Sequence, residues 1–316
     1  MEIFKIERYL GSMLGLACGD ALGAPLELTI SGMFNPVSDM IDDRRSNIVK
    51  AGMWTDDTSM ALCLAESIIE RNFFDPVNQM EKYCKWHRHG YLSSAGRCFG
   101  IGRSTENALL KFSRTGDPIC GETSPRTAGN GSIMRLCPVP LAFGNLPELA
   151  LKHAETMSKT THAAQECIDA CRLLSSLIIG CLQNKTKEEI LAKDFRVTKN
   201  LLPNPSDNSN KIKNILNGSY KNKNHLTIKS SGYVVDTLES ALWAFHNSNN
   251  FEEGALKAVN LGGDADTVGA VYGQLAGAYY GYKNIPEKWI NKISMKDKII
   301  DLAKGLYNFS EKNKWT

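Results

Sequence analysis

Glycine recurs at every fourth position in two segments near opposite ends of the chain. These positions are Gly11, Gly15, Gly19 and Gly23 in the first segment, and Gly269, Gly273, Gly277 and Gly281 in the second. Residues four apart lie on one face of an α-helix. A glycine inside a helix costs about 0.8–1.0 kcal/mol relative to alanine, so each stripe indicates that another backbone or a ligand approaches that face closely. The spacing predicts a tight central layer of helices. A membrane-spanning pair is disfavoured because both segments are short and carry polar side chains, Asp20 and Gln274.

The apolar pattern of the rest of the chain is also mainly helical. Apolar residues recur at spacings of three and four in five segments, which are 10–22, 60–69, 168–182, 235–245 and 268–280. Alternating strand patterns are scarce, so the predicted fold class is all-α. At 316 residues the chain is long enough for one large domain or two small ones, and we expect a single domain over 1–316. The polar segment at about 193–231 is predicted to be an insertion or long loop with one short helix.

Charge and cysteine content restrict the partners and the compartment. The 37 basic and 34 acidic residues are spread along the whole length, without the basic patch that nucleic-acid-binding proteins carry, so no nucleic-acid partner is expected. Several of the nine cysteines lie among apolar residues at helical spacing, which indicates buried free thiols and a reducing compartment. No signal-peptide pattern and no apolar run of roughly 18 residues is present, so we expect a cytoplasmic protein without a membrane partner.

Two acidic clusters carry the main chemical signal. Residues 54–58 read Trp-Thr-Asp-Asp-Thr and residues 262–267 read Gly-Gly-Asp-Ala-Asp-Thr, and each cluster precedes a helical pattern. Helix capping explains either cluster alone, because Thr and Asp cap helices and negative charge is favourable at a helix N-terminus. Two carboxylates exceed what one cap uses, and the pattern occurs twice. Together the clusters predict one divided metal site, whose oxygen ligands suit Mg²⁺ or Mn²⁺ better than zinc.

Three further features are ambiguous from sequence. Residues 127–132 form a loop of small residues whose backbone amides could bind phosphate oxygens, although an ordinary turn explains them better. His162 has the pattern of a helix-capping or half-buried histidine. Tyr233 fits either core packing or stacking on a nucleobase.

The chain resembles the ADP-ribosylglycohydrolase family, in particular the bacterial branch typified by the dinitrogenase reductase-activating glycohydrolase. The matching segments follow in order along nearly the whole chain: 11–27, 54–68, 129–141, 161–162, 232–245 and 261–281. The resemblance implies an orthogonal all-α fold with a binuclear Mg²⁺ or Mn²⁺ centre. The implied metal ligands are Thr55, Asp56, Asp57, Asp264, Asp266 and Thr267.

The resemblance also implies roles for other residues. Glu27, which sequence alone would make an exposed loop residue, becomes a carboxylate that activates water or lies near the metals, and Asp56 is implied at the catalytic centre. The loop implied to bind the diphosphate of ADP-ribose consists of Thr127, Ala128, Gly129, Asn130, Gly131 and Ser132. His162 and Tyr233 are implied to line the ligand site.

One position departs from the family pattern. Close bacterial members typically read Cys-Phe-Asp-Ile-Gly where this chain reads Cys-Phe-Gly-Ile-Gly at 98–102, so Gly100 replaces a carboxylate that the family places over the scissile bond. Loss of one acid–base group commonly costs about 10²–10⁴-fold in rate. The departure therefore predicts slow turnover with ligand binding retained, and recovery in a Gly100→Asp variant.

The function implied by the resemblance is metal-dependent hydrolysis of the N-glycosidic bond between ADP-ribose and arginine on modified proteins, which reverses mono-ADP-ribosylation. The expected partners are the ADP-ribosylated protein and ADP-ribose. Two alternatives stay open: hydrolysis of another ADP-ribose linkage, such as O-linked serine or an ester, and an ADP-ribose-binding pseudoenzyme impaired at Gly100.

Overall fold

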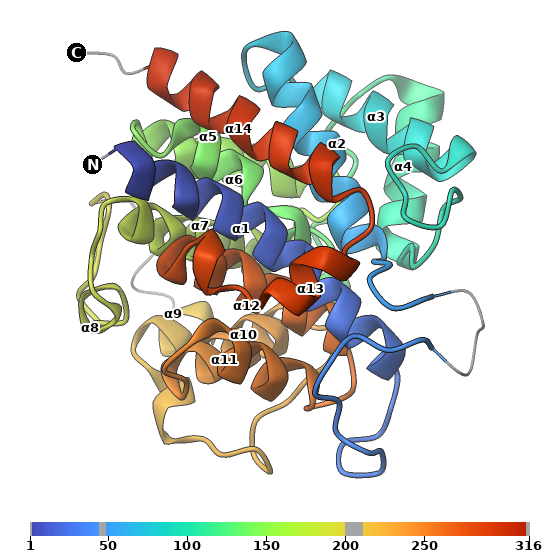
Figure 1. The fold of residues 1–316 in the computed structure, drawn as a ribbon. Helices are drawn as coiled ribbons and strands as arrows, with labels where there is room; N and C mark the ends of the chain where they lie inside the picture. The colour runs from blue at the N-terminus through green and yellow to red at the C-terminus, as the bar shows by residue number, and fades with distance from the viewer. Residues whose placement is uncertain (1, 44–48, 200–210, 314–316) are drawn as a thin grey trace.

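Helices α1 (Glu2–Gly23) and α12 (Ala265–Tyr280) pack against each other in the computed structural model (Figure 1). Their glycines form the contact. A Cβ atom added to Gly15 would overlap the carbonyl oxygen of Gly273, and one added to Gly273 would overlap that of Gly15. The same reciprocal contact joins Gly11 to Gly277 and Gly19 to Gly269, so the two helices run antiparallel. The predicted tight layer is confirmed, and its partner surface is a second glycine stripe.

The structure describes residues 2–43, 49–199 and 211–313. The other long helices are α2 (Asp56–Arg71), α3 (Pro76–His89), α4 (Arg103–Thr115), α6 (Pro147–Lys159), α7 (Gln165–Leu182), α10 (Val234–His246), α11 (Phe251–Val259) and α14 (Lys296–Lys312). The short helices are α5 (Pro138–Phe143), α8 (Lys187–Ile190), α9 (Lys211–Leu216) and α13 (Glu287–Lys292). Single 3₁₀ turns are η1 (Ala24–Leu26), η2 (Pro125–Thr127), η3 (Ile133–Arg135), η4 (Ser219–Asn222) and η5 (Tyr282–Asn284).

The fold is a single all-helical domain arranged around the α1–α12 pair. Helix α14 packs on α1 and α2, while α7, α10 and α11 pack on α12 (Figure 1). In the described residues β-structure is limited to three isolated bridges, Thr29 with Gly263, Glu122 with His162 and Gly129 with Tyr233. The all-α prediction is confirmed. A search of the described helices finds no segment with the length and apolarity of a membrane span.

All five predicted helical segments are helices, but the apolar periodicity did not locate the beginning of two of them. Helix α1 begins at Glu2 instead of residue 10, and α2 begins at Asp56 instead of residue 60. Of the polar segment 193–231, residues 200–210 lie outside the described residues, and the remainder includes α9 and η4. All nine cysteines lie in the described ranges as free thiols, eight of them buried and Cys98 half-buried.

Candidate metal centre and active site

Three helix ends meet at the acidic site. Thr55 is the N-cap residue of α2, and Asp264 is the N-cap residue of α12. Asp56 and Asp57 lie in the first turn of α2, and Asp266 and Thr267 in that of α12. The third element is the last turn of α1, which carries Asp20. Because Gly19 packs against Gly269 and Gly23 against Ala265, the register of the glycine stripes sets Asp20 beside the start of α12.

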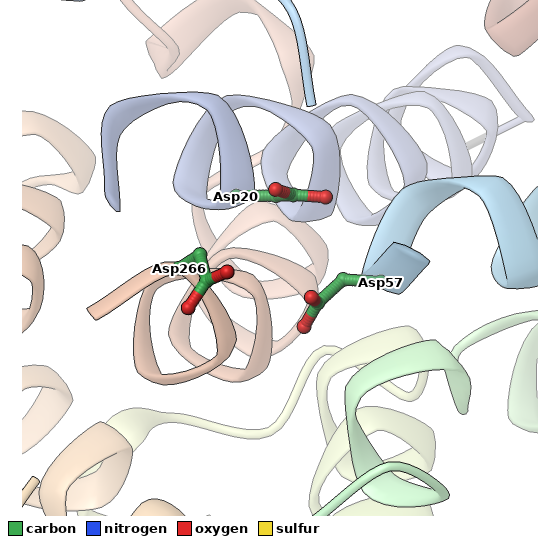
Figure 2. Close-up of side chains that lie close together, drawn as sticks. All are labelled: Asp20, Asp57 and Asp266. Atoms are coloured by element: carbon green, nitrogen blue, oxygen red, sulfur yellow. The ribbon is translucent and has the colours of Figure 1, made fainter. Parts of the chain in front are cut away.

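Five carboxylates form two groups of three, and Asp266 belongs to both groups. Oxygen atoms of Asp20, Asp57 and Asp266 lie within 4.8 Å of one another, and so do oxygen atoms of Glu27, Asp264 and Asp266. Figure 2 shows the first group, with the three carboxylates on α1, α2 and α12 around a common space. Carboxylate oxygens gathered in this way are the ligands that a divalent cation prefers.

Asp20 is a site residue that the motif analysis missed. Its Oδ1 accepts a hydrogen bond from the Thr55 amide at 2.9 Å and lies 3.0 Å from the Thr55 hydroxyl. Its Oδ2 accepts from the amide of Thr58 at 3.0 Å and from its hydroxyl at 2.6 Å. The side chain is fully buried. Asp20 therefore holds the first turn of α2 in place; its signal was an ionisable residue inside an otherwise apolar, glycine-striped helix.

Burial and mutual repulsion raise the pKa of these carboxyls. Desolvation raises the pKa of Asp20 to about 6, although the hydrogen bonds from Thr58 and Thr55 oppose it. Desolvation and the neighbouring carboxylates raise the pKa values of Asp56, Asp57 and Asp266 well above the usual range. In addition, Oδ1 of Asp57 is buried without a hydrogen-bond partner among the described residues. A divalent cation would supply the missing partner and offset the repulsion, so the residues present fit a metal site.

Glu27 reaches the site because its loop is bonded to the start of α12. The amide of Leu28 donates to the Gly263 carbonyl at 2.6 Å, and the amide of Gly263 donates to the Thr29 carbonyl at 2.8 Å. Gly263 has φ +62°, and a Cβ there would overlap the carbonyl oxygen of Ser230. A glycine is therefore required where these segments meet.

The glycine-rich loop forms one wall of the site. The side-chain amide of Asn130 donates to Asp264 Oδ2 at 2.6 Å and to the Thr237 hydroxyl at 2.9 Å. Its backbone amide donates to the Gly232 carbonyl at 3.1 Å. Asn130 thus fixes the loop to a carboxylate of the second group.

His162 and Arg135 support this loop from below. A Cβ on Gly131 would lie 2.6 Å from Cε1 of His162, so the ring packs directly beneath the glycine. Burial, with Arg135 nearby, lowers the pKa of His162 to about 3, so the ring is neutral. The guanidinium of Arg135 donates to the Gly131 carbonyl and, at 2.7 Å, to the Thr161 hydroxyl. Arg135 is a second residue that the motif analysis missed, because a buried arginine within an apolar stretch has no motif of its own.

Two adjoining hollows open at the site. The larger, about 550 Å³, is lined by many predicted site residues: Glu27, Asp56, Gly100, Gly129, Asn130, Gly131, His162, Asp264, Asp266 and Thr267. The smaller, about 300 Å³, is lined by Thr127, Ala128, Gly129 and Tyr233 among others. Ser132 lines neither; it is fully buried beneath the loop, where its hydroxyl accepts from Ser158 at 2.9 Å. Thr55 and Asp57 are buried and line neither hollow.

The fold and the site define a helical protein with a buried, carboxylate-rich centre at the base of a cavity. The family model described as ADP-ribosylglycohydrolase matches residues 1–315, and the chain belongs to this family. It is similar to the ADP-ribosylarginine hydrolase Tri1 of Pseudomonas putida (strain GB-1), with 42% identity over 96% of this chain and 78% of that protein. A solved structure titled "ADP-ribosylglycohydrolase-related protein complex" matches with a TM-score of 0.84 and 41% identity, covering 97% of this chain and 99% of the other.

The comparisons refine the expected branch of the family. The ADP-ribosyl-[dinitrogen reductase] glycohydrolase of Rhodospirillum rubrum is 29% identical over 92% of this chain and 91% of that protein. Its similarity to this chain is therefore lower than that of the Pseudomonas protein. The family assignment from sequence is confirmed. Within the family, the dinitrogen reductase glycohydrolase is a more distant relative of this chain than the Pseudomonas hydrolase.

Proposed function

We propose that this protein hydrolyses the N-glycosidic bond between ADP-ribose and an arginine side chain on modified proteins. The observation that carries the proposal is the pair of carboxylate groups sharing Asp266 at the base of a cavity of about 550 Å³. Similarity to the Pseudomonas ADP-ribosylarginine hydrolase, at 42% identity, supports the arginine linkage.

The metal assignment is part of this proposal. The residues that would hold two Mg²⁺ or Mn²⁺ ions are Thr55, Asp56, Asp57, Asp264, Asp266 and Thr267, with the Glu27 carboxylate beside them. When bound, such ions would hold the ribose hydroxyls and would lower the pKa of water. Asp20 is a positioning residue, because its oxygen atoms already accept hydrogen bonds from Thr55 and Thr58.

The protein's own groups have distinct tasks in this mechanism. Glu27, which lines the cavity from the loop side, accepts the proton of the attacking water. Within the loop at 127–132, the amides of Thr127, Gly129 and Asn130 already donate to protein carbonyls, so the bare backbone at Gly131, which lines the cavity, contacts the diphosphate. Tyr233, in the smaller hollow, stacks on the adenine. His162, neutral and buried, supports the loop instead of transferring protons.

The test uses arginine-ADP-ribosylated protein with Mg²⁺ or Mn²⁺, and the same reaction with chelator. We expect release of ADP-ribose and an unmodified arginine, with loss of activity on chelation and in Asp57→Asn and Glu27→Gln variants. Asp75→Asn is the matched control, because Asp75 caps α3 through two backbone amides outside the acidic site. Cleavage of a serine-linked substrate alone would redirect the proposal to another linkage. Binding of ADP-ribose without cleavage of either substrate would indicate a pseudoenzyme.

A further inference from the structure

An exposed apolar segment borders the active-site cavity. Leu28 is 82% exposed, Ile30 66% and Met33 78%, and with Leu226 these are the four most exposed large apolar residues described. Three of the four therefore lie within six residues of chain, directly after Glu27. We name Leu28, Ile30 and Met33 the apolar rim.

The apolar rim is held outward by a well-bonded base. Its first part is fixed by the hydrogen bonds between Leu28, Thr29 and Gly263, and the Thr29 hydroxyl donates to the Leu26 carbonyl at 2.6 Å. Farther along, the amide of Val37 donates to Asn260 Oδ1 at 2.8 Å. The apolar side chains thus lie between two attachments to the segment that precedes α12.

Leu28 links the rim to the cavity. Its φ of +60° is in the left-handed region, which is uncommon for a residue with a branched side chain. Such outliers persist where the surrounding structure determines them, and they cluster at functional sites. Leu28 is also one of the residues that line the 550 Å³ cavity. The rim therefore continues the wall of the site onto the outer surface.

We propose that the apolar rim binds the polypeptide that carries the modified arginine, through apolar side chains next to that arginine. This inference rests on the proposed function, because a substrate whose ADP-ribose lies in the cavity must have its polypeptide at the cavity mouth. An exposed apolar cluster at such a mouth marks a protein-binding surface. The rim gives the enzyme a preference for folded or peptide substrates over free ADP-ribosylarginine, which has no neighbouring polypeptide to contact Ile30 and Met33.

The experiment compares kcat/KM on an arginine-ADP-ribosylated protein and on free ADP-ribosylarginine. In an Ile30→Ser/Met33→Ser variant we expect kcat/KM on the protein to fall about tenfold or more, mainly through KM, since apolar burial is lost. Activity on the small substrate should stay within about twofold of wild type, because these two side chains lie outside the cavity lining. The Ile30→Leu/Met33→Leu variant should retain the preference for protein.

A matched control removes an exposed apolar residue far from the site. Phe73 is 51% exposed and follows the C-terminal end of α2, whose N-terminal end carries Asp56. The 16 residues of α2 separate these ends by about 24 Å at 1.5 Å per residue. Phe73→Ser should leave both substrates unaffected.

Several outcomes would overturn the inference. These are equal losses on both substrates, no loss on the protein, or the same loss in the leucine variant. A wild-type dimer that becomes monomeric in the serine variant would assign the rim to self-association. If wild type cleaves neither substrate, the proposed function fails, and the rim is then tested by calorimetry. In that case, tighter binding of the modified protein than of ADP-ribose must depend on Ile30 and Met33, and its absence overturns the inference.

Discussion

Gly100 lies directly against the carboxylate of Asp56. A Cβ atom at Gly100 would lie 2.5 Å from Asp56 Oδ1 and 3.2 Å from the Cβ of Thr55, and the backbone there has φ +83°. The position borders the cavity, as the family resemblance implies, but both space and backbone conformation favour glycine. The structure therefore argues against simple recovery of activity in a Gly100→Asp variant.

We expect Gly100→Ala and Gly100→Asp both to lower the single-turnover rate on arginine-linked substrate, by about 10²-fold if Asp56 moves by about 1 Å. Gly116→Ala is the control, because Gly116 also has a positive φ of +72°, a Cβ there meets no atom within 4 Å, and the residue lies outside the cavity lining. Faster turnover by Gly100→Asp would show that the segment rearranges to admit a carboxylate. The expectation from sequence would then be the better one.

Asp20 should control metal affinity without contacting substrate. In Asp20→Asn, an amide replaces an oxygen that accepts from Thr55 or Thr58, so the first turn of α2 loses part of its support. Residues that orient metal ligands typically change metal affinity or activity by about 10–100-fold when mutated. Titration with Mn²⁺ followed by calorimetry should show weakening of this size.

The control for Asp20 is Asp75→Asn, which weakens the cap of α3. Both variants should lower the melting temperature, but only Asp20→Asn should weaken Mn²⁺ binding. Equal Mn²⁺ affinities in wild type and Asp20→Asn would reduce the role of Asp20 to stability alone.

Local patterns made the helices and the acidic clusters predictable. A glycine stripe depends on residues four apart, and a carboxylate pair at a helix start depends on neighbours, so both are visible in sequence. The roles of Asp20 and Arg135 depend on how distant helices align, which no local pattern contains. The position of Glu27 was only partly predictable. Its own sequence pattern indicates a loop residue, and the hydrogen bond between Leu28 and Gly263 places it beside Asp264 and Asp266.

Gly273→Ala should destabilise the fold strongly, because its methyl group would overlap the Gly15 carbonyl. Overpacking a close contact typically costs about 1–3 kcal/mol, since one helix must move. Chemical denaturation should show a lower midpoint with an unchanged slope. In Gly102→Ala, by contrast, a Cβ meets no atom within 4 Å, so the free energy of unfolding should fall by no more than about 1 kcal/mol, the typical cost of alanine at an N-cap. Similar losses in the two variants would contradict the close glycine packing.

Glu66 should make stability depend on pH in the acid range. Glu66, on α2, accepts hydrogen bonds from Lys82 of α3 at 2.9 Å, from Tyr91 just after α3 at 2.6 Å and from Lys298 of α14 at 2.8 Å. Burial alone would raise the pKa of Glu66, but these donors outweigh it and lower the pKa to about 2.

Between pH about 4.5 and 2 the unfolded state binds this proton and the folded state does not, so the contribution of Glu66 decreases as the pH falls. At neutral pH, Glu66→Gln should lower the free energy of unfolding by about 1.5–3 kcal/mol, the usual contribution of hydrogen bonds to a charged group. The difference from wild type should stay constant above pH about 5.5 and vanish near pH 2. Glu70→Gln is the control, because Glu70 also pairs with Lys82 but its side chain is 53% exposed, so its loss should cost less than about 1 kcal/mol. A difference between wild type and Glu66→Gln that persists unchanged at pH 2.5 would mean that packing, and not charge, accounts for the effect.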